Sequence, residues 1–390
     1  MPRLLTALLI ALAAVLGAIW KRNIEPALEL GGIWRTVEPH GTENCTLVPE
    51  LEACEKIILH QPTGLLYAAC SSIAGRKAWL PALNYYNASA RSTADYVALY
   101  DPARATLTKL AVRGLDDARG LSVHGMDVVP SASDADVLFV YLVNHRPPPE
   151  PGAPGEDPSV EVFETRAGSG ELRHVRTVAD AAVLHSPNDV AGAPDGTRFW
   201  FTNDMKDVDG WKVRAGAKLY MFMQKPVTSV GYCHVDHGCK IALDKVPGAN
   251  GIVRVSDDRF MLGSATRPEV RVLALSPDDT LSVLSLGLTD LPLDNLTIDE
   301  DGVVWAAGFP KGAELIQKHI PDPVNNPSAS TAVRISCSNG NCTIDKPFES
   351  DGSGNIASGT TTVVHDAERK RLFLSGEWLR LCSFTRAHFL

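Results

Sequence analysis

The sequence predicts an all-β fold, a six-bladed β-propeller preceded by a short hydrophobic helix. A hairpin pattern recurs six times along the chain, and strand-like segments dominate after residue 45 while helical periodicity is poor. Each copy reads as a polar residue, a short apolar strand, a turn and a second apolar strand. Repeats of this kind, at roughly 45 to 70 residues each, are typical of a propeller with four strands per blade.

The clearest copy of the pattern lies between Asn188 and Asp204. Its two apolar runs are separated by Asp195-Gly196, and Asp-Gly between apolar runs is a strong hairpin signal. Such a hairpin brings Asn188 to the same level as Asn203 and Asp204.

The first position of each copy is expected at one mouth of the central channel, because the first strand of each blade lines that channel. All of these positions are polar, on strands that are otherwise apolar. They are Glu55, His124, Asn188, Asn250, Asn295 (with Asp294 beside it) and Thr361. A ring of carboxylate and amide oxygens that converges on an axis suits a hard cation.

Residues 4–20 form an apolar run with Arg3 before it and Lys21-Arg22 after it. Residues 1–22 are therefore expected to be a signal peptide or a signal anchor. No clean cleavage site stands out, so retention as an anchor is slightly favoured. A connecting segment over residues 23–44 and the propeller over residues 45–390 complete the chain. This arrangement predicts the secretory pathway, with the protein either membrane-anchored and facing the lumen or exterior, or secreted.

The chain has eight cysteines, which together with the N-terminus indicate an oxidising compartment and disulfides. The expected bridges are Cys233–Cys239 and Cys337–Cys342 across short loops, and Cys45–Cys382 to fasten the two ends of a closed ring. Cys54 and Cys70 flank the first hairpin, and the sequence leaves their pairing open. Zinc is the competing interpretation, but no Cys-x-x-Cys pair is present.

Three further features concern the surface. The net charge of -9 and the lack of a basic stripe argue against a nucleic-acid partner. Glycosylation sequons occur at Asn44, Asn87, Asn295 and Asn341, of which Asn87 is the most plausible glycan site. The proline-rich stretch over residues 147–154 predicts a solvated loop inside the second blade.

An ordered set of short motifs carries a family resemblance. The motifs are Ser122-Val123-His124-Gly125-Met126, Val143-Asn144-His145, Pro187-Asn188-Asp189-Val190, Thr202-Asn203-Asp204, Ala249-Asn250-Gly251-Ile252 and Asp294-Asn295. With them, from about Glu43 to Cys382, the chain resembles the serum paraoxonase/arylesterase family. One such tripeptide is weak, whereas the ordered set over most of the chain is a strong signal.

The resemblance implies a catalytic calcium in the channel. Its ligands would be Glu55, Asn188, Asn250, Asp294 and Asn295. Calcium takes 6–8 oxygens, so five protein ligands leave room for water and a substrate oxygen. A single one of these Asn residues would be read more readily as a strand-end cap; the set together favours a metal site.

The resemblance also implies that His124 and His145 act as a pair that activates water. They lie almost symmetrically about the turn at Ser133-Asp134, so a regular hairpin places them side by side. The alternative is that one of them only hydrogen-bonds the calcium shell. Asp204 is expected to orient or tune the pair.

Two positions depart from the family pattern. Lys56 stands where an acidic residue usually helps to hold a second, structural calcium, so we expect this deeper site to be lost and Lys56 to pair with Asp189. Phe309 stands where relatives often carry a histidine, which changes the pocket wall and puts the substrate preference in doubt.

The sequence therefore predicts a calcium-dependent hydrolase of lactones and/or aryl esters, with a small-molecule substrate and the membrane as a partner. The alternative is a non-enzymatic membrane-anchored propeller of the same family, a chaperone or assembly factor. A strictosidine-synthase-like propeller is a third possibility, against which the Asp294-Asn295 pair argues.

Overall fold

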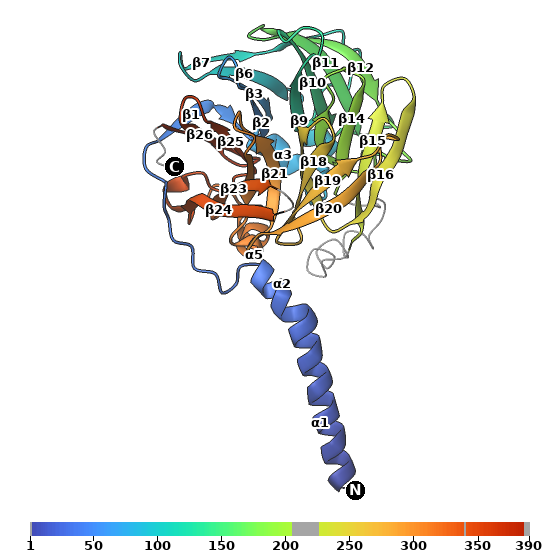
Figure 1. The fold of residues 1–390 in the computed structure, drawn as a ribbon, viewed down its shortest axis with the longest axis vertical. Coiled ribbons are helices and arrows are strands. Elements are labelled where there is room, and N and C mark those ends of the chain that lie inside the picture. Colours follow the sequence, from blue (N-terminus) through green and yellow to red (C-terminus); the bar gives the residue numbers. More distant parts are fainter. Residues whose placement is uncertain (1, 205–225, 339–340, 386–390) are drawn as a thin grey trace.

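The computed structural model describes residues 2–204, 226–338 and 341–385, and it has six β-sheets arranged in a ring (Figure 1). The predicted six-bladed propeller is confirmed. One strand of each sheet lies innermost, and these strands contact one another in chain order before the last returns to the first. The inner strands are β2 (Cys54–His60), β9 (Val123–Pro130), β13 (Pro187–Gly192), β17 (Ala249–Ser256), β21 (Leu293–Ile298) and β25 (Thr362–Asp366).

The other strands follow outward in each blade. The first two blades add β3 (Leu65–Cys70), β6 (Tyr96–Asp101) and β7 (Thr106–Lys109), then β10 (Val137–Asn144), β11 (Ser159–Arg166) and β12 (Glu171–Val178) with β8 (Ala111–Arg113) parallel to it. The next two add β14 (Arg198–Asn203), β15 (Thr228–His234) and β16 (Gly238–Val246), then β18 (Arg259–Ser264), β19 (Glu269–Leu275) and β20 (Leu281–Leu288). The fifth adds β22 (Val304–Gly308), β23 (Ser330–Ser338) and β24 (Asn341–Ser350), and the sixth adds β26 (Arg371–Ser375), β27 (Arg380–Thr385) and β1 (Cys45–Glu52).

The hydrophobic core lies between neighbouring blades. Each strand alternates its side chains between the two faces of its sheet, and each face packs against the next blade. Trp200 of β14 and Phe260 of β18, for example, belong to one buried cluster with ring centroids 4.8 Å apart. Because the apolar side chains pack between the sheets, the core does not require apolar residues at the channel-facing ends of the inner strands. Polar residues can therefore occupy these ends.

The ring is closed by strands from both ends of the propeller. β1 pairs antiparallel with β27, with Leu47 opposite Cys382, and the expected disulfide Cys45–Cys382 is present. The two short bridges, Cys233–Cys239 and Cys337–Cys342, are present as well. Cys54 and Cys70, whose pairing the sequence leaves open, face each other across β2 and β3 and are also bonded.

A long exposed helix precedes the propeller. It comprises α1 (Pro2–Ile19), a π-helical turn over Trp20–Ile24 and α2 (Glu25–Leu30), and it points away from the blades (Figure 1). The span Leu5–Leu30 is long and apolar enough to cross a membrane. The helix therefore continues past residue 22, into the stretch that the sequence assigns to the connecting segment.

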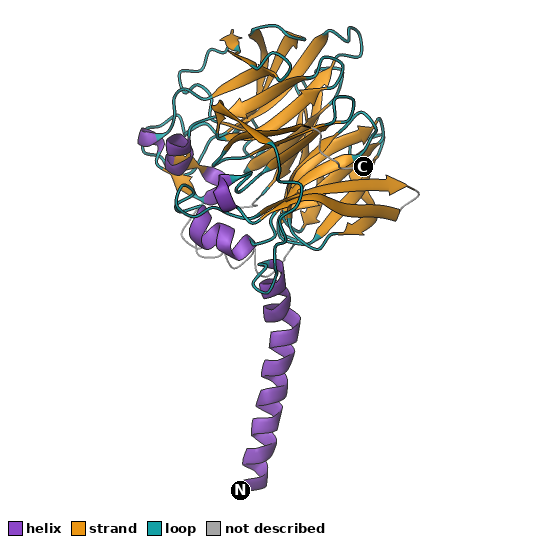
Figure 2. Ribbon diagram, turned by 90° about the vertical axis from the view of Figure 1, so that its left-hand side faces the viewer, coloured by secondary structure: helices purple, strands orange, loops and turns teal. Residues whose placement is uncertain are grey.

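Short helices lie in the connections between strands, on one side of the propeller (Figure 2). They are α3 (Ile73–Ala78), α5 (Gly312–Glu314), the π-helical turn Leu315–His319 and the 3₁₀ turns Pro81–Leu83, Ala88–Ala90 and Ser353–Asn355. The small hairpin of β4 (Trp79–Leu80) and β5 (Tyr85–Tyr86) accompanies α3. The end of the N-terminal helix joins this side, because Ala313 donates its amide hydrogen to the carbonyl of Gly31 at 2.9 Å.

We predict that the ring-closing disulfide contributes more stability than a local one. Cys45 and Cys382 are separated by 337 residues and Cys233 and Cys239 by 6. In the chain-entropy model this difference is worth about 3–4 kcal/mol. Thermal unfolding of the Cys45→Ser/Cys382→Ser double variant should therefore begin well below that of Cys233→Ser/Cys239→Ser. Equal unfolding temperatures for the two double variants would contradict this assignment.

Candidate active site

The polar positions of the repeat all lie at the same end of the inner strands. Each is the second or third residue of its strand, apart from Thr361, which directly precedes its strand. They are Glu55 in β2, His124 in β9, Asn188 in β13, Asn250 in β17, Asp294 and Asn295 in β21, and Thr361 just before β25. His145 and Asp204 directly follow β10 and β14, the second strands of their blades, and so lie at the same end.

Two glycines let the inner strands approach closely here. A Cβ atom on Gly125 would lie 2.2 Å from the carbonyl oxygen of Asn188, and one on Gly251 would lie 2.4 Å from the amide nitrogen of Leu296. Both distances are far below van der Waals contact, so no other residue fits without moving the backbone. The glycines that follow His124 and Asn250 thus allow the site residues of neighbouring blades to converge.

Several oxygens at this mouth are buried and have no hydrogen-bond partner in the described part of the chain. They are Oε2 of Glu55 and the Oδ1 atoms of Asn188, Asn250 and Asn295. Asn295 donates through Nδ2 to Oε1 of Glu55 at 2.5 Å, which leaves its own oxygen free. Unpaired buried polar atoms are costly, and carboxylate and amide oxygens are the donors that a hard cation prefers. These residues therefore fit a bound calcium ion.

Amides are essential to such a site. In the described part of the chain, no group of three or more His, Cys, Asp or Glu residues could hold a metal by itself. A cation at this mouth would depend on the Asn oxygens as well as on the carboxylates of Glu55 and Asp294.

The carboxylates at the mouth are desolvated and close to one another. Burial, reinforced by the charge of Glu377, raises the pKa of Glu55 to about 8. Burial and then the charge of Glu55 raise the pKa of Asp294 well above its ordinary value. Like charges in a buried cluster oppose each other's ionisation, and a cation among them would reverse that effect. The buried carboxylates at the mouth thus favour the binding of a cation.

His124 and His145 lie side by side, with ring centroids 4.9 Å apart and planes at 70°. The expected symmetry of the hairpin is present, since Asn144 of β10 pairs with Val123 of β9. Burial lowers the pKa of His124 well below its ordinary value, which keeps the ring neutral. Among the residues that the structure describes, Nδ1 of His124 and Nε2 of His145 have no hydrogen-bond partner. The pair therefore presents two ring nitrogens that are free to exchange a proton.

Asp204 is linked to the histidine pair indirectly, through the side-chain amide of Asn188. Asn188 donates through Nδ2 to Oδ2 of Asp204 at 3.2 Å, and the same nitrogen lies 3.3 Å from Nε2 of His124. Burial raises the pKa of Asp204 to about 7. The aspartate is therefore placed to orient the amide of Asn188 between the metal-ligand candidates and the histidines.

Two acidic residues belong to the site but were not predicted. Oε1 of Glu377 lies 3.6 Å from Nδ1 of His124, and Oε2 of Glu156 lies 2.5 Å from Nδ1 of His145. Glu377 follows β26 closely, just as Asp204 follows β14, so polar residues after the second strand of each blade were a usable signal. Glu156 stands in the proline-rich loop, where no periodicity points to it.

The two departures from the family pattern are also visible. Nζ of Lys56 lies 2.6 Å from Oδ2 of Asp189 and donates to the carbonyl of Leu296 at 3.0 Å, so the expected ion pair is confirmed. Both side chains are almost completely buried. Phe309 follows β22, and its amide donates to the carbonyl of Pro292 at 3.1 Å, which places it beside the start of β21.

Fold and site together define a propeller that gathers polar side chains from successive blades at one mouth of its channel. The chain belongs to the arylesterase family, whose model matches residues 36–379. Serum paraoxonase/arylesterase 1 of Rattus norvegicus is 24% identical over 305 residues, which cover 77% of this chain and 78% of the relative.

Two solved structures are similar to the chain at low sequence identity. A gluconolactonase from Xanthomonas campestris is 15% identical with a TM-score of 0.46, covering 89% of this chain and 92% of that one. Virginiamycin B lyase from Staphylococcus aureus is 9% identical with a TM-score of 0.44, covering 87% of this chain and 97% of that one. At these values neither likeness bears on the chemistry.

We predict that replacing Lys56 by methionine destabilises the fold by about 3–5 kcal/mol, because the charge of Asp189 is then buried without its partner. Urea unfolding with chelator present would measure the change without rescue by a metal ion. Lys318→Met, on an exposed helical turn, is the matched control and should unfold like the wild type. An unchanged midpoint for Lys56→Met would show that the ion pair is not a structural requirement.

Proposed function

We propose that this protein is a calcium-dependent hydrolase of lactones and/or aryl esters. The observation that supports the proposal most is the set of buried, unpartnered oxygens beside a buried histidine pair, in which burial lowers the pKa of His124. Membership of the arylesterase family points in the same direction, as does the name of the rat relative. The substrate is a small molecule that enters the channel mouth.

The residues that would hold the ion are Glu55, Asn188, Asn250, Asp294 and Asn295. The carboxylates of Glu55 and Asp294 would together balance the two positive charges, and their side chains are held in place by burial. When bound, calcium supplies a positive charge that polarises an ester carbonyl and stabilises the negative charge that develops on its oxygen.

The histidines handle the proton. His124 is neutral because of its burial, so it can take a proton from an attacking water. His145 is in ring contact with it and offers a second free nitrogen, Nε2, for sharing that proton. Asp204 keeps the pair aligned through the amide of Asn188. Each imidazole is shielded from bulk water, which restricts proton exchange to groups within the site.

The deeper calcium site of the family is proposed to be lost. The Lys56 ammonium supplies a positive charge next to Asp189, where a second cation would otherwise be needed. A fixed ammonium and a divalent ion cannot both occupy the same small polar space.

We infer that the protein enters the secretory pathway and is held at a membrane by its N-terminal helix. The span Leu5–Leu30 and four disulfides support this inference. Asn87 is exposed and remains the best glycan acceptor, whereas Asn295 is fully buried at the channel mouth and is not one.

Purified protein should hydrolyse members of a panel of lactones and aryl esters, and chelation should abolish that activity. Metal analysis should find one tightly held calcium per chain, because Lys56 replaces the second. Re-addition of calcium should restore the rate. Two calcium ions that both resist dialysis would contradict the loss of the deeper site.

Substitutions of the histidines and of the candidate metal ligands should have different effects on turnover and stability. His124→Gln should lower turnover by roughly 10²–10⁴, the usual contribution of a general base, with calcium binding and thermal stability near wild type. His145→Gln should show a smaller loss of the same kind. Asn250→Ala or Asp294→Ala should abolish activity and also lower stability, since the ion would link several blades.

Turnover, calcium content and unfolding temperature must be measured on the same samples. If His124→Gln hydrolyses every substrate as fast as the wild type, the role of the pair is refuted. If the calcium-loaded wild type hydrolyses none of them, the non-enzymatic, membrane-anchored propeller becomes the better explanation.

A further inference from the structure

Glu156 reaches the histidine pair from an unexpected direction. It stands near the end of the proline-rich loop that joins β10 to β11, and its side chain is fully buried. Its Oε2 lies 2.5 Å from Nδ1 of His145. The contact is shorter than an ordinary N–H···O hydrogen bond, and hydrogen bonds to an ionised carboxylate are shorter than neutral ones. The loop thus inserts a carboxylate behind the ring that faces His124.

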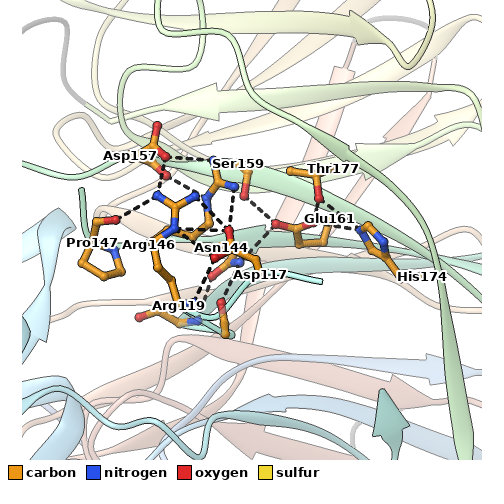
Figure 3. Close-up of polar contacts among 12 residues, drawn as sticks. Asp117, Arg119, Asn144, Arg146, Pro147, Asp157, Ser159, Glu161, His174 and Thr177 are labelled. Carbon is orange, nitrogen blue, oxygen red and sulfur yellow. Dashed lines mark hydrogen bonds and ion pairs between the residues drawn. The ribbon is translucent and has the colours of Figure 1, made fainter. Parts of the chain in front are cut away.

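The loop is held by a compact group of ion pairs around Asp157, the residue that follows Glu156 in the chain (Figure 3). Arg119 donates through Nη1 to Oδ2 of Asp157 at 2.6 Å and to the carbonyl of Pro147 at 3.1 Å. Arg146 donates through Nε to the carbonyl of Asp157 at 3.0 Å. Because both ends of the loop are fastened in this way, the residue before Asp157 has little freedom to leave His145.

These ion pairs do not neutralise Glu156. Two arginines, Arg119 and Arg146, face two aspartates, Asp117 and Asp157, so the group balances its own charge. The second oxygen of Glu156, Oε1, is buried and has no hydrogen-bond partner within the described residues. His145 is therefore the group against which the Glu156 carboxylate acts.

A nearby carboxylate shows what a purely structural role looks like. Glu161 of β11 is also buried, and it accepts hydrogen bonds from Asn144, Ser159, Thr177 and His174 (Figure 3). The hydrogen bonds that Glu161 accepts join the strands and loops of the blade. Glu156 makes no such set of bonds and is directed at one ring nitrogen.

We propose that Glu156 is a positioning residue for hydrolysis that fixes His145 in the tautomer with the proton on Nδ1. Nε2 of His145 is then left as a lone-pair acceptor beside His124. When a proton from water reaches this pair, the carboxylate stabilises the positive charge on the imidazole without taking the proton itself. The inference rests on the proposed function, and it adds a third member to the proton-handling group.

The test compares Glu156→Gln with Glu156→Asp and with the control Glu150→Gln, which makes the same change at an exposed position of the same loop. Loss of the carboxylate partner of a catalytic histidine costs about 10⁴-fold in kcat in a serine protease. We expect Glu156→Gln to lower kcat by at least about tenfold with KM and unfolding temperature unchanged. Glu156→Asp should recover part of the loss, and Glu150→Gln should match the wild type.

A second measurement does not depend on activity. In full-length protein labelled with ¹⁵N-histidine, the ring nitrogens of His145, assigned by comparison with His145→Gln, should report the Nδ1–H tautomer. Glu156→Gln should shift them or mix the two tautomers, while Glu150→Gln should not. Unchanged His145 signals in Glu156→Gln would overturn the inference, as would unchanged kcat in an active enzyme.

Failure of the proposed function would look different. A wild type that hydrolyses nothing would refute the hydrolase, and the nitrogen signals would then decide alone whether Glu156 sets the tautomer. If every Glu156 variant that loses kcat also unfolds at a correspondingly lower temperature, Glu156 is a structural residue. That outcome would also overturn the proposal.

Discussion

Closure of the ring is the constraint on which the rest of the structure depends. β1 completes the last blade from the N-terminal side, and a disulfide fastens the joint. The effect of closure reaches the channel mouth, because the hydroxyls of Thr361 and Thr362 donate to the carbonyl of Glu55 at 2.8 and 2.6 Å. The first and last blades are thereby held side by side where Glu55 presents its carboxylate. A site assembled from successive strands of a ring exists only while the ring is closed.

The channel also has to accommodate several buried charges. Deep in the channel the problem is solved within the protein, by the direct contact of Lys56 with Asp189. At the mouth no lysine or arginine is paired in this way with Glu55 or Asp294 in the described structure, and burial raises the pKa of both. The deep carboxylate of Asp189 is thus neutralised by a lysine, whereas the carboxylates at the mouth are not. The mouth is therefore the part of the channel that is suited to an exchangeable cation.

Much of this arrangement could be read from the sequence. The period of the hairpins gave the six blades, and the polar first position of each copy gave the inner-strand ends, because alternation and turn signals are local properties. The Lys56–Asp189 contact was expected from the family resemblance, because Lys56 stands where an acidic residue usually helps to hold a second calcium. The cysteines predicted that Cys45–Cys382 joins the two ends of the ring, but the pairing of β1 with β27 was not predicted, since pairing between distant strands leaves no local pattern.

The two acidic partners of the histidines differ in the same respect, because one follows a local sequence pattern and the other does not. Glu377 stands close behind the second strand of its blade and could have been found by extending the repeat pattern to that position. Glu156 could not, because its approach to His145 depends on how Arg119 and Arg146 fold an irregular loop. Loop conformation is set by tertiary contacts rather than by periodicity.

The division of labour between strands and connections has an evolutionary consequence. The candidate metal ligands occupy the starts of strands, where the backbone is fixed by the sheets, whereas Glu156 and Phe309 stand in the connections between strands. Insertions in such connections are tolerated because they leave the sheets intact. A change in such a connection could therefore alter the residues around the channel mouth while the ring of oxygens at the strand starts stayed in place.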